Sequence, residues 1–181
     1  MLSNYNLTPD SHKNISYSVT LVPRIEYSVT ILDDIIRILK KKKLELKKFN
    51  REIIDHEESD KIIIHAIEQE RTVLFSLEIL LAIRCTLSQI SRIDSIPERL
   101  SSNISMSRIA SAKLYPFLPS CSHKLSELSL HLGSIVLDSA ILTKATFNFH
   151  YSNEESTKLL NELNLIVDSK LSKQYPNLDF S

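Results

Sequence analysis

The sequence predicts an all-α protein, and three observations support this fold class. One glycine occurs in 181 residues, which argues against the tight hairpins, Rossmann turns and phosphate-binding loops that need glycine. Leucine and isoleucine recur at steps of three and four residues through long segments, as on one face of a helix. Prolines lie where such segments begin or end. We therefore expect a long antiparallel helical hairpin followed by shorter helices.

The chain divides into three parts. Residues 1–22 are polar and predict a flexible N-terminal tail, residues 23–150 predict one helical core, and residues 151–181 predict a C-terminal helix and tail. A chain of this length is large enough for one domain with one sizeable core.

The first helix is expected over residues 24–55. Pro23 is suited to its first turn, because the missing N–H is not needed there. An apolar stripe with heptad-like spacing follows: Ile25, Val29, Leu32, Ile36, Leu39, Leu46 and Ile53. Lys43 and Asn50 interrupt this stripe at two seam positions.

The segment DHEESD, residues 55–60, predicts the turn of the hairpin, with Ser59 or Asp60 as the cap of the second helix. No breaker follows until Pro97, so this helix is expected to continue almost to that residue. Its apolar stripe is Ile63, Ile67, Leu74, Leu77 and Leu81, widened by Ala66, Val73, Leu80 and Leu87.

Three shorter helices are expected after the hairpin. A serine-rich one covers residues 98–115, and the prolines of YPFLPS (115–120) break it. The next covers residues 121–145, and NFHYSN (148–153) forms a linker. The last helix ends before Pro176.

Charge is unevenly distributed, although 22 basic and 22 acidic residues leave the chain neutral. Residues 37–51 carry eight basic side chains and one acid, whereas residues 52–70 carry seven acids and one lysine. Like charges at i and i+4 weaken a helix, so we expect something to offset this cost.

The residues favour no catalytic, metal or cofactor chemistry, and we expect a protein that is not an enzyme. No two histidines have the i, i+4 spacing that places two metal ligands on one helix face. Cys85 and Cys121 are expected to be buried or half-buried thiols in a reducing compartment. No segment resembles a signal peptide or an uncharged bilayer span of about 20 residues, which predicts a cytoplasmic protein.

Four interpretations of the basic segment compete. A solvated helix face is the simplest. Nucleic-acid binding would supply phosphates, but Phe49 is the only aromatic residue for base stacking in the segment, so no nucleic acid is expected. An anionic membrane would attract the lysines at about 1 kcal/mol each. An acidic protein docked on a soluble coiled-coil scaffold is the alternative to the membrane.

The order of these segments resembles the ESCRT-III-like CdvB proteins of archaeal cell division. The segments that carry the resemblance are ILDDIIRILKKKKLELKKFNREI (31–53), HAIEQERTVLFSLEILLAIRCTLSQIS (65–91), KLYPFLPSCSHKLSELSLHLGSIVLDS (113–139) and NEESTKLLNELNLIVDSKLSKQYPNL (153–178). The match is one of helix order, spacing and charge over residues 24–178, without a catalytic motif.

The resemblance implies an ESCRT-III-like subunit that forms filaments with itself or with paralogues and remodels membrane in cell division or vesicle release. It implies a peripheral location at the inner face of the cell membrane, at the division site, with the ATPase CdvC and the protein CdvA as partners. The membrane-binding role then falls on Arg37, Lys40, Lys41, Lys43, Lys47, Lys48 and Arg51. The polymer-contact role falls on Leu74, Leu77 and Leu81. An ATPase-recruiting role falls on Leu159, Leu163 and Ile166, although Glu162 stands where a basic residue is expected.

Overall fold

A computed structural model describes residues 20–56, 59–144 and 153–176, with no side chains described for 153–155. Within these ranges the chain is all-helical and has no strand, which confirms the predicted fold class. The elements are α2 (Val22–Asp55), α3 (Asp60–Ser88), the short 3₁₀ helix η1 (Ile93–Ser95), α4 (Ile96–Leu114), α5 (Pro119–Thr143) and α6 (Asn153–Gln174). The predicted linker at 148–153 lies almost entirely outside the described residues.

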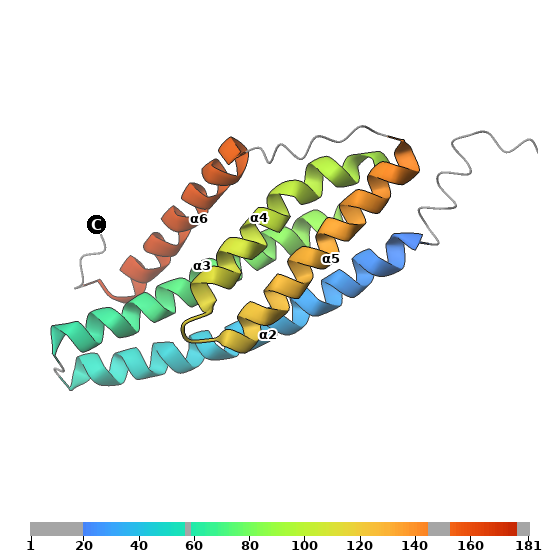
Figure 1. Cartoon of the computed structure of the whole chain (residues 1–181). Coiled ribbons are helices and arrows are strands. Elements are labelled where there is room, and N and C mark those ends of the chain that lie inside the picture. Colours follow the sequence, from blue (N-terminus) through green and yellow to red (C-terminus); the bar gives the residue numbers. More distant parts are fainter. Residues whose placement is uncertain (1–19, 57–58, 145–152, 177–181) are drawn as a thin grey trace, which may run out of the picture.

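Helices α2 and α3 form the predicted antiparallel hairpin (Figure 1). Most of the predicted stripe of α2 is buried against the rest of the molecule, whereas Val29 is half-buried. Leu21 is also fully buried, so the core includes the end of the predicted tail. An exposed ion pair joins the two helices, because Arg84 Nε donates to Asp33 Oδ1 at 2.5 Å. This hydrogen bond lowers the pKa of Asp33 below its ordinary value.

The second helix is shorter than predicted. Helix α3 ends at Ser88, and the chain turns through residues 89–95 before α4 begins at Ile96. The turn is held locally, since Ser95 Oγ donates to the Arg92 carbonyl at 2.8 Å. Ile93 within the turn and Ile96 at the start of α4 are both buried, and α4 folds back on α3. Pro97 therefore lies in the first turn of α4 and does not terminate α3.

Serine side chains lie in the contact between α4 and α5. Ser107 Oγ donates to the Leu125 carbonyl at 3.1 Å, and Ser111 Oγ lies 2.9 Å from both the carbonyl oxygen and Oγ of Ser122. Small hydroxyl side chains allow two helices to approach closely while every hydroxyl keeps a partner. The serine-rich segment thus has a packing role in this conformation.

Helix α5 is the most apolar helix of the described residues. By length and composition alone it could cross a membrane, with a mean hydropathy of 1.3 over its best 18-residue window, and 39% of that window is buried. The sequence expectation excluded an uncharged span, whereas α5 carries three charged residues, Lys124, Glu127 and Asp138. A core helix of a soluble protein passes the same test, so the finding is weak evidence for a span.

The last helix packs on the hairpin. Helix α6 contacts α3 and α4 and buries Leu163, Val167 and Leu171. Figure 1 shows α6 over the half of the hairpin near its turn, and α4 with α5 over the other half. The half of α2 that carries the lysines is therefore covered mainly by α3.

Candidate functional site: the basic face of α2

Five of the eight basic side chains of residues 37–51 form one exposed surface, which we call the basic face: Arg37, Lys40, Lys41, Lys48 and Arg51. Their spacings of three, four, seven and eleven residues place them on one side of an α-helix. The face is about 21 Å long at 1.5 Å per residue. Lys42, Lys43 and Lys47 lie outside the basic face and are half-buried.

A leucine lies in the middle of the basic face. Leu44 is 66% exposed and follows Lys40 by four residues and precedes Lys48 by four. Leucine at such a position contributes nothing to the core of this molecule. Its place off the apolar stripe of α2 was visible in the sequence, but the sequence reasoning did not identify it.

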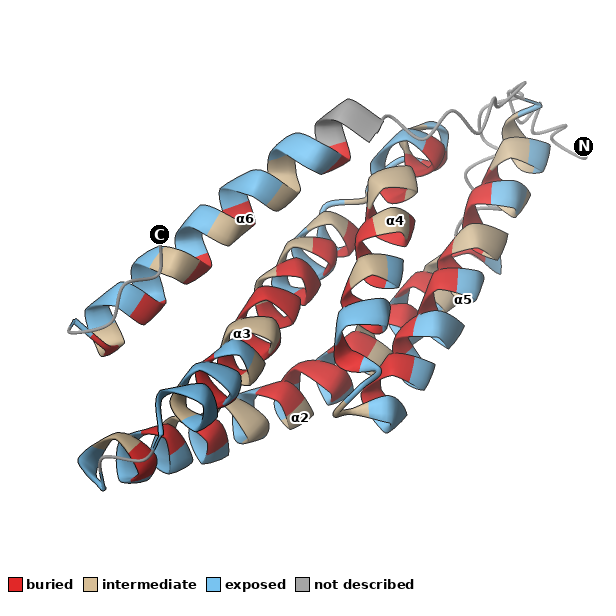
Figure 2. Cartoon of the chain, turned by 60° about the vertical axis from the view of Figure 1, so that its left-hand side comes forward, coloured by how far each residue is buried: buried red, intermediate tan, exposed pale blue. Residues whose placement is uncertain are grey.

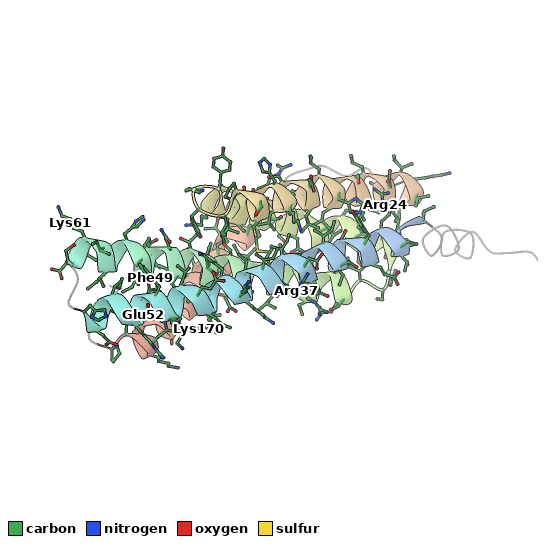
Figure 3. The ribbon with its side chains drawn as sticks, turned by 90° about the horizontal axis from the view of Figure 1, so that it is seen from below. Arg24, Arg37, Phe49, Glu52, Lys61 and Lys170 are labelled. Atoms are coloured by element: carbon green, nitrogen blue, oxygen red, sulfur yellow. The ribbon has the colours of Figure 1, made fainter. Side chains whose placement is uncertain are left out.

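The basic face is only partly neutralised by the protein itself. Arg37 pairs with Asp34 at 2.8 Å, and Lys48 lies 3.8 Å from Glu52. Within the described ranges, no carboxylate lies within 4.0 Å of Lys40, Lys41 or Arg51. Figure 3, drawn from below, shows α2 along its length, with Arg37 at its middle and Glu52 near the hairpin turn. The face therefore presents net positive charge.

One acid of the segment 52–70 is not at the surface. Glu70 is fully buried and accepts hydrogen bonds from three side chains, which we call the Glu70 cluster. Asn50 Nδ2 and Tyr175 Oη each donate to Glu70 Oε2 at 2.7 Å, and Gln174 Nε2 donates to Oε1 at 2.7 Å. Asn50 interrupts the apolar stripe of α2 because it reaches this carboxylate. The cluster joins α2, α3 and the end of α6.

Two ion pairs extend the contact between α6 and α3. Arg71 lies 2.9 Å from Asp168, and Lys170 donates to Glu78. Together with the apolar side chains beneath α6, these contacts hold the C-terminal helix on the hairpin. The sequence reasoning missed this arrangement, because residues about 100 positions apart do not reveal that they meet.

The residues expected to make polymer contacts and to recruit the ATPase differ in how far they are exposed. Leu74 and Leu77 are buried in the core, and Leu81 is exposed. In this conformation the first two are not accessible to another subunit, and their role in a polymer stays a prediction. In α6, Leu163 is buried, Leu159 is half-buried and Ile166 is 43% exposed, so Ile166 alone of the three is classed as exposed.

The other candidate ligands are dispersed. No group of three or more His, Cys, Asp or Glu side chains among the described residues could hold a metal ion. Cys121 is buried as expected, but Cys85 is exposed on α3, which corrects that expectation. His131 packs its ring against Tyr27 with centroids 5.4 Å apart, and Nε2 lies 3.3 Å from the Arg24 carbonyl oxygen.

No protein-family model matches the chain, and neither the curated proteins nor the solved structures contain a match. The inference of function therefore depends on the surfaces just described.

The Glu70 cluster gives Tyr175 an unusual titration. Burial raises the pKa of Tyr175 from 10.0 to about 12, and the hydrogen bond to Glu70 is the second largest cause of this shift. Because the folded chain keeps this proton while an unfolded tyrosine loses it, stability is expected to fall as the pH rises from 10 to 12.

A spectrophotometric titration of the six tyrosines checks this prediction. We expect one late ionisation near pH 12 in the wild type and its loss in Tyr175→Phe. The matched control is Tyr115→Phe, which removes an exposed tyrosine and should keep the late step. A wild-type titration without a late component would contradict the burial of Tyr175.

Proposed function

We propose that this chain is a non-enzymatic, membrane-associated subunit that binds anionic lipid through the basic face of α2. In this proposal the subunit assembles with itself or with paralogous ESCRT-III-like subunits into filaments that remodel or constrict membrane during cell division or vesicle release. It works at the inner face of the cell membrane, with CdvC and CdvA as partners of the assembly.

The observation that carries the proposal is the pattern on one side of α2. Five exposed cations lie along about 21 Å of helix, and three of them have no carboxylate partner among the described residues. Each cation gains about 1 kcal/mol near anionic headgroups, which offsets the repulsion within the helix. Leu44 lies between them, where an apolar side chain can enter the boundary between headgroups and acyl chains.

Other parts of the structure are consistent with an assembling subunit. The hairpin is long, and each of its helices exceeds 28 residues. Exposed apolar side chains also remain on α5 and α6, outside the basic face of α2. The second candidate is a soluble scaffold that docks an acidic protein on the same basic face, since carboxylates and phosphates both pair with lysine and arginine.

Co-sedimentation of the full chain with vesicles tests the proposal. We expect pelleting with vesicles that contain phosphatidylserine, little pelleting with phosphatidylcholine vesicles, and filaments or deformed vesicles in negative-stain micrographs of the pellets. High salt should release the protein, because exposed charges are screened.

The negative results separate the alternatives. Failure to pellet with either vesicle, together with binding to a polyglutamate peptide, would favour the docking scaffold. Pelleting without any filament would retain the lipid surface and reject the filament. Binding to single-stranded RNA in preference to anionic vesicles would reject the membrane proposal.

A further inference from the structure

Gly133 is the single glycine of the chain, and nothing in the part of the chain that the structure describes requires it. It lies in the middle of α5, where glycine is less favourable than alanine by roughly 1 kcal/mol. Its φ is not positive, so the backbone does not need a glycine. A Cβ built there would meet no atom within 4 Å, so the packing of the described residues does not need one either.

Exposed apolar side chains lie beside Gly133 on the same helix. Leu130 is 71% exposed, Leu137 is 49% exposed and Ile141 is 72% exposed. Figure 2 shows α5 at the outside of the bundle, with an exposed side turned away from α4. Large apolar side chains aligned on one helix face mark an interaction surface more often than single scattered ones do.

The exposed side of α5 has the spacing of a helix–helix seam. Steps of three, four, three, four and three residues connect its members, which we call the α5 seam: Glu127, Leu130, Ser134, Leu137, Ile141 and Lys144. Five of the six are exposed, whereas Ser134 is half-buried at the border with α2 and accepts a hydrogen bond from Arg24 Nη2 at 2.5 Å. Such spacing keeps one line of side chains facing a partner helix. Gly133 borders this line, and the absence of a side chain there lets a second backbone come close.

The α5 seam is complementary to itself when it is reversed. In an antiparallel pair, Leu130 lies opposite the partner's Ile141, and Ser134 lies opposite the partner's Leu137. The two ends of each seam carry opposite charges, Glu127 at one end and Lys144 at the other. In the antiparallel pair Glu127 therefore lies beside the partner's Lys144. A parallel pair would place each charge beside its own copy, which is unfavourable.

We propose that α5 is a homodimer interface, in which the α5 seams of two copies pack antiparallel and cross beside Gly133. The seam is about 26 Å long, and one helix pair buries less area than the roughly 800 Å² per partner of a standard interface. The dimer is therefore weak and forms at high local concentration. It does not depend on lipid binding, since the basic face of α2 takes no part in it.

Sedimentation equilibrium of the full chain over a wide concentration range, without lipid, tests the dimer. Gly133→Ala is the diagnostic variant, because it should raise the melting temperature by about 2 °C and yet weaken dimerisation at least fivefold. If Gly133 affected only the stability of α5, the substitution would change the melting temperature and leave dimerisation unchanged. Leu137→Ser should weaken dimerisation about tenfold, whereas Leu165→Ser, an exposed leucine of α6, should leave it unchanged.

Charge reversal tests the antiparallel register. Glu127→Lys and Lys144→Glu should each weaken the dimer severalfold, and the double variant should regain wild-type association. A wild type that stays monomeric at every concentration would overturn the proposal, as would Gly133→Ala with unchanged association. Loss of vesicle binding in Leu137→Ser with no effect on association would assign the seam to the membrane and overturn it equally.

Discussion

Removing four cations from the basic face is expected to weaken binding to anionic vesicles on the order of a thousandfold. The variant replaces Lys40, Lys41, Lys48 and Arg51 by glutamine, which keeps helix propensity and removes charge. Each cation contributes about 1 kcal/mol at an anionic surface, so four contribute about 4 kcal/mol. Partitioning measured by co-sedimentation over a range of lipid concentrations gives the change directly.

The matched control also removes four positive charges, but from surfaces outside the basic face. It replaces four exposed lysines outside the basic face by glutamine: Lys61, Lys124, Lys158 and Lys173. We expect this control to bind within about threefold of the wild type, because long-range attraction is screened beyond about 8 Å at physiological salt. Equal losses in both variants would show that net charge, and not the basic face, drives the binding.

Leu44 gives an independent measure of the same contact. Leu44→Ser keeps every charge and removes an exposed apolar side chain. If the face enters the lipid boundary, vesicle binding decreases, while binding to soluble polyglutamate is unchanged. If α2 meets an acidic protein only through its charges, both are unchanged.

Glu70→Ala is expected to lower the free energy of unfolding by about 3 kcal/mol. Three donors lose this carboxylate as an acceptor: Asn50 Nδ2, which keeps a long hydrogen bond of 3.5 Å to the Ala66 carbonyl, Gln174 Nε2 and Tyr175 Oη. A buried donor without a partner costs about 1–3 kcal/mol, although the loss of a buried carboxylate recovers part of that cost. Chemical denaturation measures the difference, and hydrogen exchange should show reduced protection in α6.

Glu68→Ala is the matched control for this prediction. Glu68 lies two residues away on the same helix, is exposed and makes only a 3.9 Å ion pair with Arg71. Such a pair contributes less than about 1 kcal/mol. Similar unfolding curves for the two variants would contradict the view that the Glu70 cluster holds α6 on the hairpin.

Residue order along the chain was enough to anticipate the helices. Apolar residues that recur every three or four positions predicted the ends of α2, α4, α5 and α6 to within about two residues. This was possible because the periodicity is a property of each segment alone. The end of α3 was misplaced by several residues, because neither glycine nor proline marks Ser88. The reversal there depends on Ile93 and Ile96 finding a place in the core.

Composition and local spacing thus established an all-helical chain and a concentrated positive charge on one long helix, because both follow from neighbours in sequence. The fold then decided which charges are free. It buries Glu70 among donors from α2 and the end of α6, and it leaves Lys40, Lys41 and Arg51 without carboxylate partners among the described residues. It also leaves Leu130, Leu137 and Ile141 uncovered beside Gly133. These distinctions depend on contacts between residues up to about 125 positions apart, and the spacing of residues within one helix carries no information about them.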